Sequence, residues 1–390
     1  MLRLMGLGLT SAASAPWLAG CGSRDEPDPA VHSTTTTTTT TAAPAERIAP
    51  VWLGPLGEAD RNGLRLPAGF TSRVIATSGA IVAGTSYKWH PNPDGGATFA
   101  HDDGGWTYVS NCEDMEVGGV GRVRFGADGE VIDAGRICDG TLRNCAGGAT
   151  PWGTWLTCEE VAEGRVWECD PNGERPATVL PAMGRFNHEA VVVDPVAKVL
   201  YLSEDDPEGA LYRFTPSSYP DLAEGVLEVL AGAEGSRRWA LVEDPSGGSE
   251  PTRNQVADVV RFNGGEGMAH FEGTTYLTTK GDNRVWALDG RDVSVVYDAA
   301  DYDEPLLKGV DNITVDAGGD RYVAEDGDTM DIVRLGPGGL VEQVVVVVDQ
   351  DGSEVTGPAF SPDGTRLYFS SQRPGITYEV TGPFPHAMGV

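Results

Sequence analysis

The sequence has few basic residues for its length. Lys and Arg together number 28 against 58 Asp and Glu, so the 390-residue chain carries a formal net charge of −30. This imbalance disfavours nucleic acids and anionic membrane surfaces as partners, because like charges repel one another. It suits a protein that binds hard cations through carboxylates, although high solubility alone would also account for it.

Motifs of several enzyme classes are also missing. The sequence contains no G-x-S-x-G, H-E-x-x-H, G-x-x-x-x-G-K or C-x-x-C motif. These absences disfavour nucleophile-elbow hydrolases, zinc proteases, P-loop enzymes and thioredoxin-type redox proteins. Since no nucleophile and base pair stands out, metal-assisted hydrolysis is the leading enzymatic class.

The N-terminal segment predicts an exported lipoprotein. Residues 1–21 form a short apolar signal that ends in the lipobox "LAGC", whose Cys21 would be lipidated and anchor the chain to a membrane. Residues 22–47 contain the run Thr34–Thr41 and almost nothing apolar, so we expect a disordered tether there. The folded domain should occupy 48–390, and we expect it at the cell surface or outside the cell.

A repeated unit indicates the fold. Short alternating strands bounded by Gly, Pro, Asp and Asn recur six times, and helical periodicity is scarce. The aromatic anchors of the six copies are Tyr108, Trp155, Tyr201, Tyr276, Tyr322 and Tyr368, spaced by 47, 46, 75, 46 and 46 residues. Such a period is typical of propeller blades, and the long interval holds an insertion near residues 222–260. The pattern predicts an all-β, six-bladed β-propeller with one decorated blade, and the alternative is an irregular sandwich.

A propeller brings equivalent positions of its blades together around one axis. The positions just after the anchors read Asn111 and Cys112, Cys158 and Glu159, Glu204 and Asp205, Thr279 and Lys280, Glu325 and Asp326, Ser371 and Gln372. The preceding strands add Glu189, Glu266, Asp311 and Asn312. Clustered carboxylates repel one another at low dielectric, so this arrangement predicts a ring that binds cations. Lys280 and Arg373 are candidate substrate-binding residues at the same level.

Cys158 adds a soft donor to this predicted ring. Calcium prefers oxygen ligands and transition metals accept thiolates, so a mixed site with both kinds of ion is expected. Five cysteines remain after Cys21, an odd number that leaves at least one unpaired within the chain. The alternative for Cys158 is a disulfide to Cys145 or Cys169. His188 is more typical of a core histidine than of a ligand.

Several stretches together resemble one known family. They are "GGWTYVSNCE", "NCAGGATPWGTWLTCEE", "GRFNHEAVVVD", "YLSEDD", "DNITVD", "AEDG" and "GPAFSPDGTRLYFSSQRPG", in that order. The chain resembles a short variant of the PhoX-type secreted alkaline phosphatases. The resemblance implies an exported six-bladed propeller with an iron and calcium cluster on its axis that hydrolyses phosphate monoesters.

The resemblance also implies ligands. Cys158 would bind iron, Glu159, Glu189 and Glu266 would bind iron and calcium, and Asp205 or Asp206, Asp311, Asn312 and Glu325 would complete the site. The family commonly has Arg-Pro-Glu-Gly where this chain has Gly264-Gly265-Glu266-Gly267, so a phosphate-binding arginine is replaced by Gly264. Lys280 or Arg373 would have to substitute for it.

The expected function is therefore metal-dependent hydrolysis of small phosphate esters, with a metal-held water or oxygen rather than a side chain as nucleophile. No protein partner is predicted. One alternative is a calcium-dependent propeller lactonase or esterase, which would leave Cys158 unused. The other is a surface binding propeller without catalysis.

Overall fold

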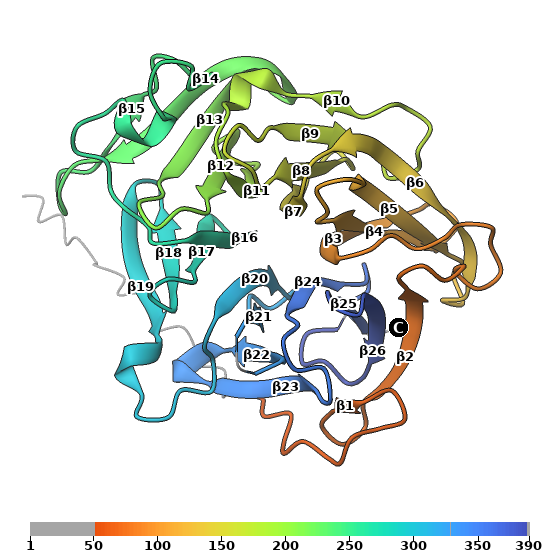
Figure 1. Cartoon of the computed structure of the whole chain (residues 1–390). Helices are drawn as coiled ribbons and strands as arrows, with labels where there is room; N and C mark the ends of the chain where they lie inside the picture. The colour runs from red at the N-terminus through yellow and green to blue at the C-terminus, as the bar shows by residue number, and fades with distance from the viewer. Residues whose placement is uncertain (1–50, 328, 388–390) are drawn as a thin grey trace, which may run out of the picture. The chain divides into compact units, whose positions relative to one another are not determined.

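The computed structural model describes residues 51–327 and 329–387, and in this part every regular element except four short 3-10 turns is a strand. The strands form six antiparallel sheets around an axis, which confirms the predicted six-bladed propeller (Figure 1). We number the blades by their innermost strands, in chain order. The 3-10 turns are η1 (Pro181–Met183), η2 (Thr252–Asn254), η3 (Ala299–Asp301) and η4 (Pro337–Gly339).

Blade 1 contains β3 (Pro93–Ala100), β4 (Trp106–Cys112), β5 (Gly118–Phe125) and β6 (Val131–Thr141). Blade 2 contains β7 (Asn144–Ala149), β8 (Trp155–Glu159), β9 (Val166–Cys169) and β10 (Thr178–Val179). Blade 3 contains β11 (His188–Asp194), β12 (Val199–Glu204), β13 (Leu211–Ser218), β14 (Asp221–Ala231) and β15 (Arg238–Leu241). Blade 3 is the decorated one, since the predicted insertion supplies β15 and η2.

Blade 4 contains β16 (Gly265–Phe271), β17 (Thr274–Thr279), β18 (Arg284–Asp289) and β19 (Asp292–Asp298). Blade 5 contains β20 (Val310–Val315), β21 (Arg321–Glu325), β22 (Asp331–Leu335) and β23 (Val341–Val347), and blade 6 contains β24 (Val355–Phe360), β25 (Arg366–Ser371) and β26 (Ile376–Thr381). Two N-terminal strands complete blades 5 and 6. Strand β1 (Leu64–Arg65) pairs with β23, and β2 (Thr71–Thr77) pairs with β26. Pairing the start of the domain with its last blade closes the ring of blades and covers the edge of β26.

Aromatic side chains fill the space between neighbouring blades. The ring of Tyr108 in blade 1 stacks on that of Tyr368 in blade 6, with centroids 5.0 Å apart. Both side chains are fully buried, as is Tyr322 in blade 5. The repeated aromatic residues therefore mark packing between blades, and burial of such large side chains stabilises the closed ring.

The predicted signal peptide, the lipobox at Cys21 and the tether lie outside the described residues. Within the part of the chain that the structure describes, we find no helix with the length and apolar character needed to cross a membrane.

Candidate functional site

The innermost strands carry a β-bulge in every blade. In blades 1 to 5 the bulge directly follows the pair between the first residue of the innermost strand and the last residue of the next strand, such as Asn144 and Glu159. The first bulged residue in these blades is acidic or a cysteine: Asp94, Cys145, Glu189, Glu266 and Asp311. A bulge inserts an extra residue and redirects its side chain, and here it places one polar group per blade beside the axis.

The bulged residues form a first tier of polar side chains, and a second tier follows the end of the second strand of each blade. The residue after the last position of each is Glu113, Glu160, Asp205, Lys280, Asp326 or Gln372, in blade order. Ligand atoms from both tiers, together with Glu354 just before β24, approach within 4.8 Å in four overlapping groups: Asp94, Glu113 and Cys145; Cys145, Glu160 and Glu189; Glu189, Glu266 and Asp311; Asp311, Asp326 and Glu354. We call these nine residues the axial ring.

Burial raises the pKa values of several acids of the axial ring. Burial and the neighbouring Glu266 raise the pKa of Glu189 well above its ordinary value. Burial, followed by the negative charge of Glu113, raises the pKa of Glu160 to about 8, even though Arg143 opposes the shift. Burial also raises the pKa of Asp311 to about 6 and that of Glu354 to about 9. The ring therefore holds more acids than its surroundings can stabilise as anions.

The thiol of the ring belongs to Cys145. Its Sγ donates to Oε1 of Glu189 at 3.2 Å, while Oε2 of Glu189 is buried and has no hydrogen-bond partner among residues 51–327 and 329–387. Burial and the charges of Asp94 and Glu189 raise the pKa of the Cys145 thiol well above its usual range. An unpaired buried carboxylate oxygen is costly, and a cation beside it would remove that cost. The donor set of carboxylates and one thiol thus fits hard cations together with one thiophilic metal.

Two basic side chains contact the axial ring among the described residues. Arg143 pairs with Glu160 at 2.8 Å and also contacts Glu113. Lys280 Nζ lies 3.0 Å from both Glu266 Oε1 and Asp326 Oδ2, and 3.8 Å from Asp311 Oδ2. Burial lowers the pKa of Lys280, but these three carboxylates outweigh it and hold the pKa above its ordinary value. Two cations cannot balance the eight carboxylates of the ring.

The innermost strands approach one another too closely for a channel beside the ring. A Cβ at Gly95 would lie 2.6 Å from Cα of Ala146, and one at Gly267 would lie 2.7 Å from Cα of Asn312. The cavity between these strands has a volume of only about 40 Å³. This volume is comparable to that of a single water molecule and is too small for an ester. A substrate must therefore approach the ring from its other side.

Comparison with known proteins links part of this chain to one family. The model of the alkaline phosphatase PhoX family matches residues 117–175 and 162–287. The structure of Pseudomonas fluorescens PhoX in complex with vanadate, a transition state analogue, aligns with a TM-score of 0.68 at 16% identity, over 82% of this chain and 96% of that one. The chain is therefore similar to the PhoX family over residues 117–287 and shares the propeller fold of the Pseudomonas fluorescens protein.

Two other similar structures align with lower TM-scores. A protein of unknown function from Bacteroides thetaiotaomicron aligns with a TM-score of 0.54 at 10% identity, covering 80% of this chain and 76% of that one. A gluconolactonase from Xanthomonas campestris aligns with a TM-score of 0.48 at 15% identity, covering 86% and 100%. No curated protein matches the sequence.

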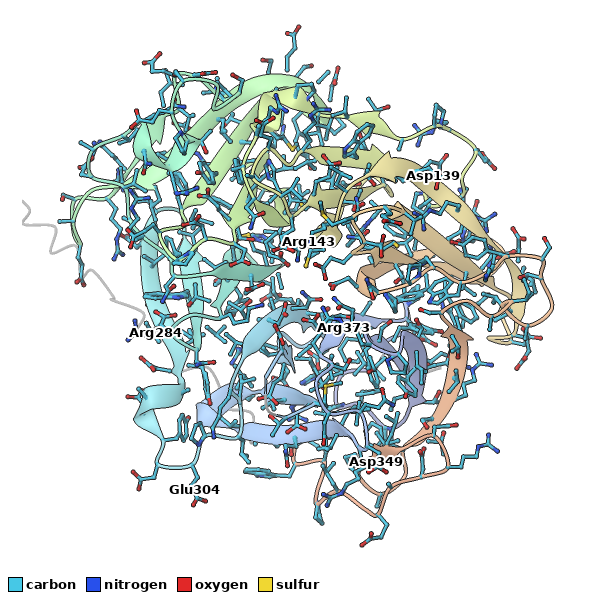
Figure 2. The ribbon with its side chains drawn as sticks, viewed as in Figure 1. Asp139, Arg143, Arg284, Glu304, Asp349 and Arg373 are labelled. Atoms are coloured by element: carbon cyan, nitrogen blue, oxygen red, sulfur yellow. The ribbon has the colours of Figure 1, made fainter. Side chains whose placement is uncertain are left out.

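The structure brings only some of the predicted ligands together. Glu189, Glu266 and Asp311 lie in the axial ring, and Lys280 contacts it. Asp205 is half-buried next to the ring, and its charge raises the pKa of Glu266. Figure 2 shows Arg373 at the inner side of its blade, and its guanidinium makes no hydrogen bond or ion pair with the described residues.

Cys158 does not belong to the axial ring of the described residues. It lies in an apolar cluster between blades 2 and 3, packed among Leu156, Val166 and Leu202. It also forms no disulfide, because all five cysteines of the described part are free thiols. The thiol that lies among the carboxylates is therefore that of Cys145, not the expected thiol of Cys158.

Glu159, Glu325 and Asn312 are not members of the axial ring and form hydrogen bonds with neighbouring groups. Glu159 accepts hydrogen bonds from the backbone N–H groups of Leu142 and Arg165, at 3.0 and 3.1 Å. Glu325 likewise accepts from Lys308 N at 2.5 Å. The amide of Asn312 donates to Asp311 at 2.8 Å, and its Oδ1 accepts from Gly357 N at 2.6 Å, so it orients Asp311 and joins blades 5 and 6.

For Cys158 and Glu159 in blade 2, the reason for the difference is a one-residue shift in register. The aromatic anchors align Tyr108 and Trp155 with Tyr201, whereas the hydrogen-bonded pairs make Val109 and Leu156 equivalent to Tyr201. A shift by one residue moves every side chain of a strand to its other face. In blades 1 and 2 the residues that lie beside the axis are therefore one position later in the sequence than the aromatic anchors indicate, so Glu113 and Glu160 take the place of Cys112 and Glu159.

The sequence analysis did not choose six members of the axial ring as metal ligands: Asp94, Glu113, Cys145, Glu160, Asp326 and Glu354. Of these six, only Asp326 was named at an axial position of the predicted ring. One signal was available for the first tier. Asp94 and Cys145 are each followed by a small residue and then glycine, as Glu266 is followed by Gly267. Small residues are needed there because the innermost strands nearly touch. Glu354 directly precedes β24, and the repeated sequence unit contains no equivalent position from which it could have been predicted.

Gly264, where the family pattern has an arginine, lies next to Lys280. A Cβ at Gly264 would be 3.9 Å from Cβ of Lys280 and 3.4 Å from Oδ1 of Asp205. The glycine has a φ of +66°, a left-handed conformation that other residues adopt at a cost. Lys280 thus supplies a positive charge beside this position.

Proposed function

We propose that this chain is a metal-dependent phosphatase that hydrolyses small phosphate esters at the axial ring. The observation that carries the proposal is the continuous set of buried and half-buried carboxylates with one thiol, whose oxygen atoms exceed the cations available to them. The match to the PhoX family model supports a phosphate ester as the substrate. The vanadate bound by the Pseudomonas fluorescens relative supports the same choice.

The ligand set divides by chemistry. Cys145, with Glu160 and Glu189 beside it, would hold iron, because a thiolate favours a transition metal. The all-oxygen groups around Asp311 and Glu354 would hold calcium. When bound, such ions withdraw charge from a phosphoryl group and lower the pKa of a coordinated water.

The remaining groups of the chain bind and orient the substrate. Lys280, about one third exposed and in contact with the ring, would donate to a phosphoryl oxygen. Arg373 has a guanidinium free for the same task at the inner side of blade 6. The tightly packed innermost strands beneath the ring exclude bulk water from that side. No side chain is assigned as the nucleophile.

The location of the protein is part of the proposal. A lipobox at Cys21 and a tether up to residue 47 would hold the propeller at the cell surface, where hydrolysis of esters would supply phosphate. Replacing Cys21 with Ala should release the protein into the soluble fraction. Retention in the membrane fraction would contradict the anchor.

Two measurements test the function. Elemental analysis of protein purified without chelators should find iron together with calcium. A substrate screen should then find hydrolysis of p-nitrophenyl phosphate that EDTA and vanadate inhibit. Calcium without iron, with lactone hydrolysis, would favour the lactonase alternative. Both metals without turnover of any phosphate ester would favour a binding propeller.

A further inference from the structure

Arg143 has a backbone conformation that is unusual for a residue other than glycine. It lies between β6 and β7 with a φ of +40°, where a residue other than glycine is uncommon. Two hydrogen bonds hold it there: Arg143 N donates to Asp114 O at 3.1 Å, and Glu160 N donates to Arg143 O at 2.9 Å. A strained conformation maintained by its surroundings is a reason to look for a role of the side chain.

The guanidinium of Arg143 is only partly used by its acidic neighbours. Nε donates to Glu113 Oε1 at 2.8 Å, and Nη2 lies 2.8 Å from Glu160 Oε2. Nη1 has no partner among the described residues, and 38% of the side chain is exposed. Figure 2 shows Arg143 near the middle of the propeller, in contrast to Asp139 only a few residues earlier. The free edge of the guanidinium is therefore available to a ligand above the ring.

Arg143 and Lys280 lie on opposite sides of the axis. The innermost strands follow one another around it as β3, β7, β11, β16, β20 and β24 (Figure 1). Arg143 joins carboxylates of blades 1 and 2, and Lys280 joins carboxylates of blades 4 and 5. These two junctions are separated by three blades in either direction, so the cations face each other across the ring.

We propose that Arg143 is a substrate-binding residue that, with Lys280 opposite, clamps the phosphoryl oxygens of the ester from two sides. This inference rests on the proposed function. A guanidinium offers parallel N–H groups that match two oxygens of a phosphate, and it stays charged at any working pH. A phosphate dianion would otherwise be repelled by the acids of the ring, so cations at its rim are required for binding.

The test compares Arg143→Ala and Arg143→Lys with Arg238→Ala. Arg238 also binds a carboxylate in two places, that of Asp258, but at the outer strand of blade 3. Inorganic phosphate is titrated calorimetrically into each protein after loading with calcium and iron, and metal content is measured on the same samples. We expect Arg143→Ala to weaken phosphate binding about 10- to 100-fold with unchanged metal content. Arg143→Lys should weaken it less, and Arg238→Ala should match the unaltered protein.

Added guanidinium chloride at millimolar concentration should partly restore phosphate binding to Arg143→Ala and leave Arg238→Ala unaffected. If the phosphate affinity of Arg143→Ala is within twofold of that of the unaltered protein, the proposed role of Arg143 is wrong, while the proposed function is unaffected. Loss of metal from both Arg143 variants would also overturn this role, since the residue would then act only as a counterion. If the unaltered, metal-loaded protein neither binds phosphate nor hydrolyses esters, the proposed function fails and the clamp fails with it.

Discussion

The thiol of Cys145 donates a 3.2 Å hydrogen bond to Oε1 of Glu189, although the two residues belong to neighbouring blades. Each is the first bulged residue of its innermost strand, so the bulges bring a soft and a hard donor together. The second oxygen of Glu189 has no partner. This pair is the part of the axial ring that is best suited to a transition metal, and it is the first to test.

Replacing Cys145 with Ser should remove bound iron. A hydroxyl is a far weaker ligand than a thiolate for a thiophilic metal, so iron content should fall below about one tenth of the original. Cys158→Ser is the matched control, because Cys158 is equally buried but packs among apolar side chains. Elemental analysis and visible absorption check both variants. Iron lost from Cys158→Ser and kept by Cys145→Ser would reverse the assignment.

Glu159 and Glu160 are adjacent but should behave differently. Glu160→Gln removes a charge from the axial ring and should lower metal content and activity. Glu159→Gln should leave metal content intact and lower the free energy of unfolding by about 1–2 kcal/mol, because an amide nitrogen cannot accept one of the two backbone N–H bonds. Metal analysis and urea unfolding of the two variants test this. Equal metal loss in both would contradict the division.

Removing metal should make stability depend on pH. The pKa values of Asp311, Glu160 and Glu354 are raised to about 6, 8 and 9, above their values in an unfolded chain. The folded protein therefore holds protons that the unfolded chain releases, and the stability of the metal-free protein should fall as pH rises from 5 to 9.

Calcium should oppose this loss most strongly at high pH, where the carboxylates bind it without first releasing protons. Thermal unfolding with EGTA and with calcium, at pH 5.5, 7 and 8.5, measures the effect. A metal-free melting temperature that rises with pH over this range would contradict the burial of the ring.

Gly264→Arg should strengthen phosphate binding at some cost in stability. The left-handed φ of +66° should cost about 1 kcal/mol for any residue with a Cβ, while the added guanidinium would lie beside Asp205 and Lys280. Gly264→Ala has the same strain without the charge and serves as the control. Phosphate affinity and thermal unfolding are measured for both. Equal phosphate affinity of the two variants would show that this position does not face the substrate.

Much of the architecture could be predicted from local pattern. The aromatic anchors recur at intervals near 46 residues because each blade repeats the same packing against its neighbours, and Tyr108 and Tyr368 show that packing directly. Glu189, Glu266 and Asp311 could be placed near the axis because they precede their anchors at matching distances. The closure by β2 was not predicted, since it depends on a pairing between residues about 300 positions apart.

The choice between neighbouring residues could not be made from the sequence. Cys145 and Cys158 lie on adjacent strands of one blade, and both are fully or nearly fully buried. Aromatic spacing locates a strand but does not determine its register, and a single-residue shift exchanges its two faces. Glu159 was preferred to Glu160 for this reason.

The sequence by itself determined the six-bladed propeller, the resemblance to the PhoX family and the abundance of acids, because strand period and motif spacing are local properties of the chain. Only the tertiary structure decided which acids meet, that Cys145 is the thiol among them, and that Arg143 and Lys280 face each other. Those relationships depend on bulges and on hydrogen-bonded register between strands, which are set when all six blades pack around one axis.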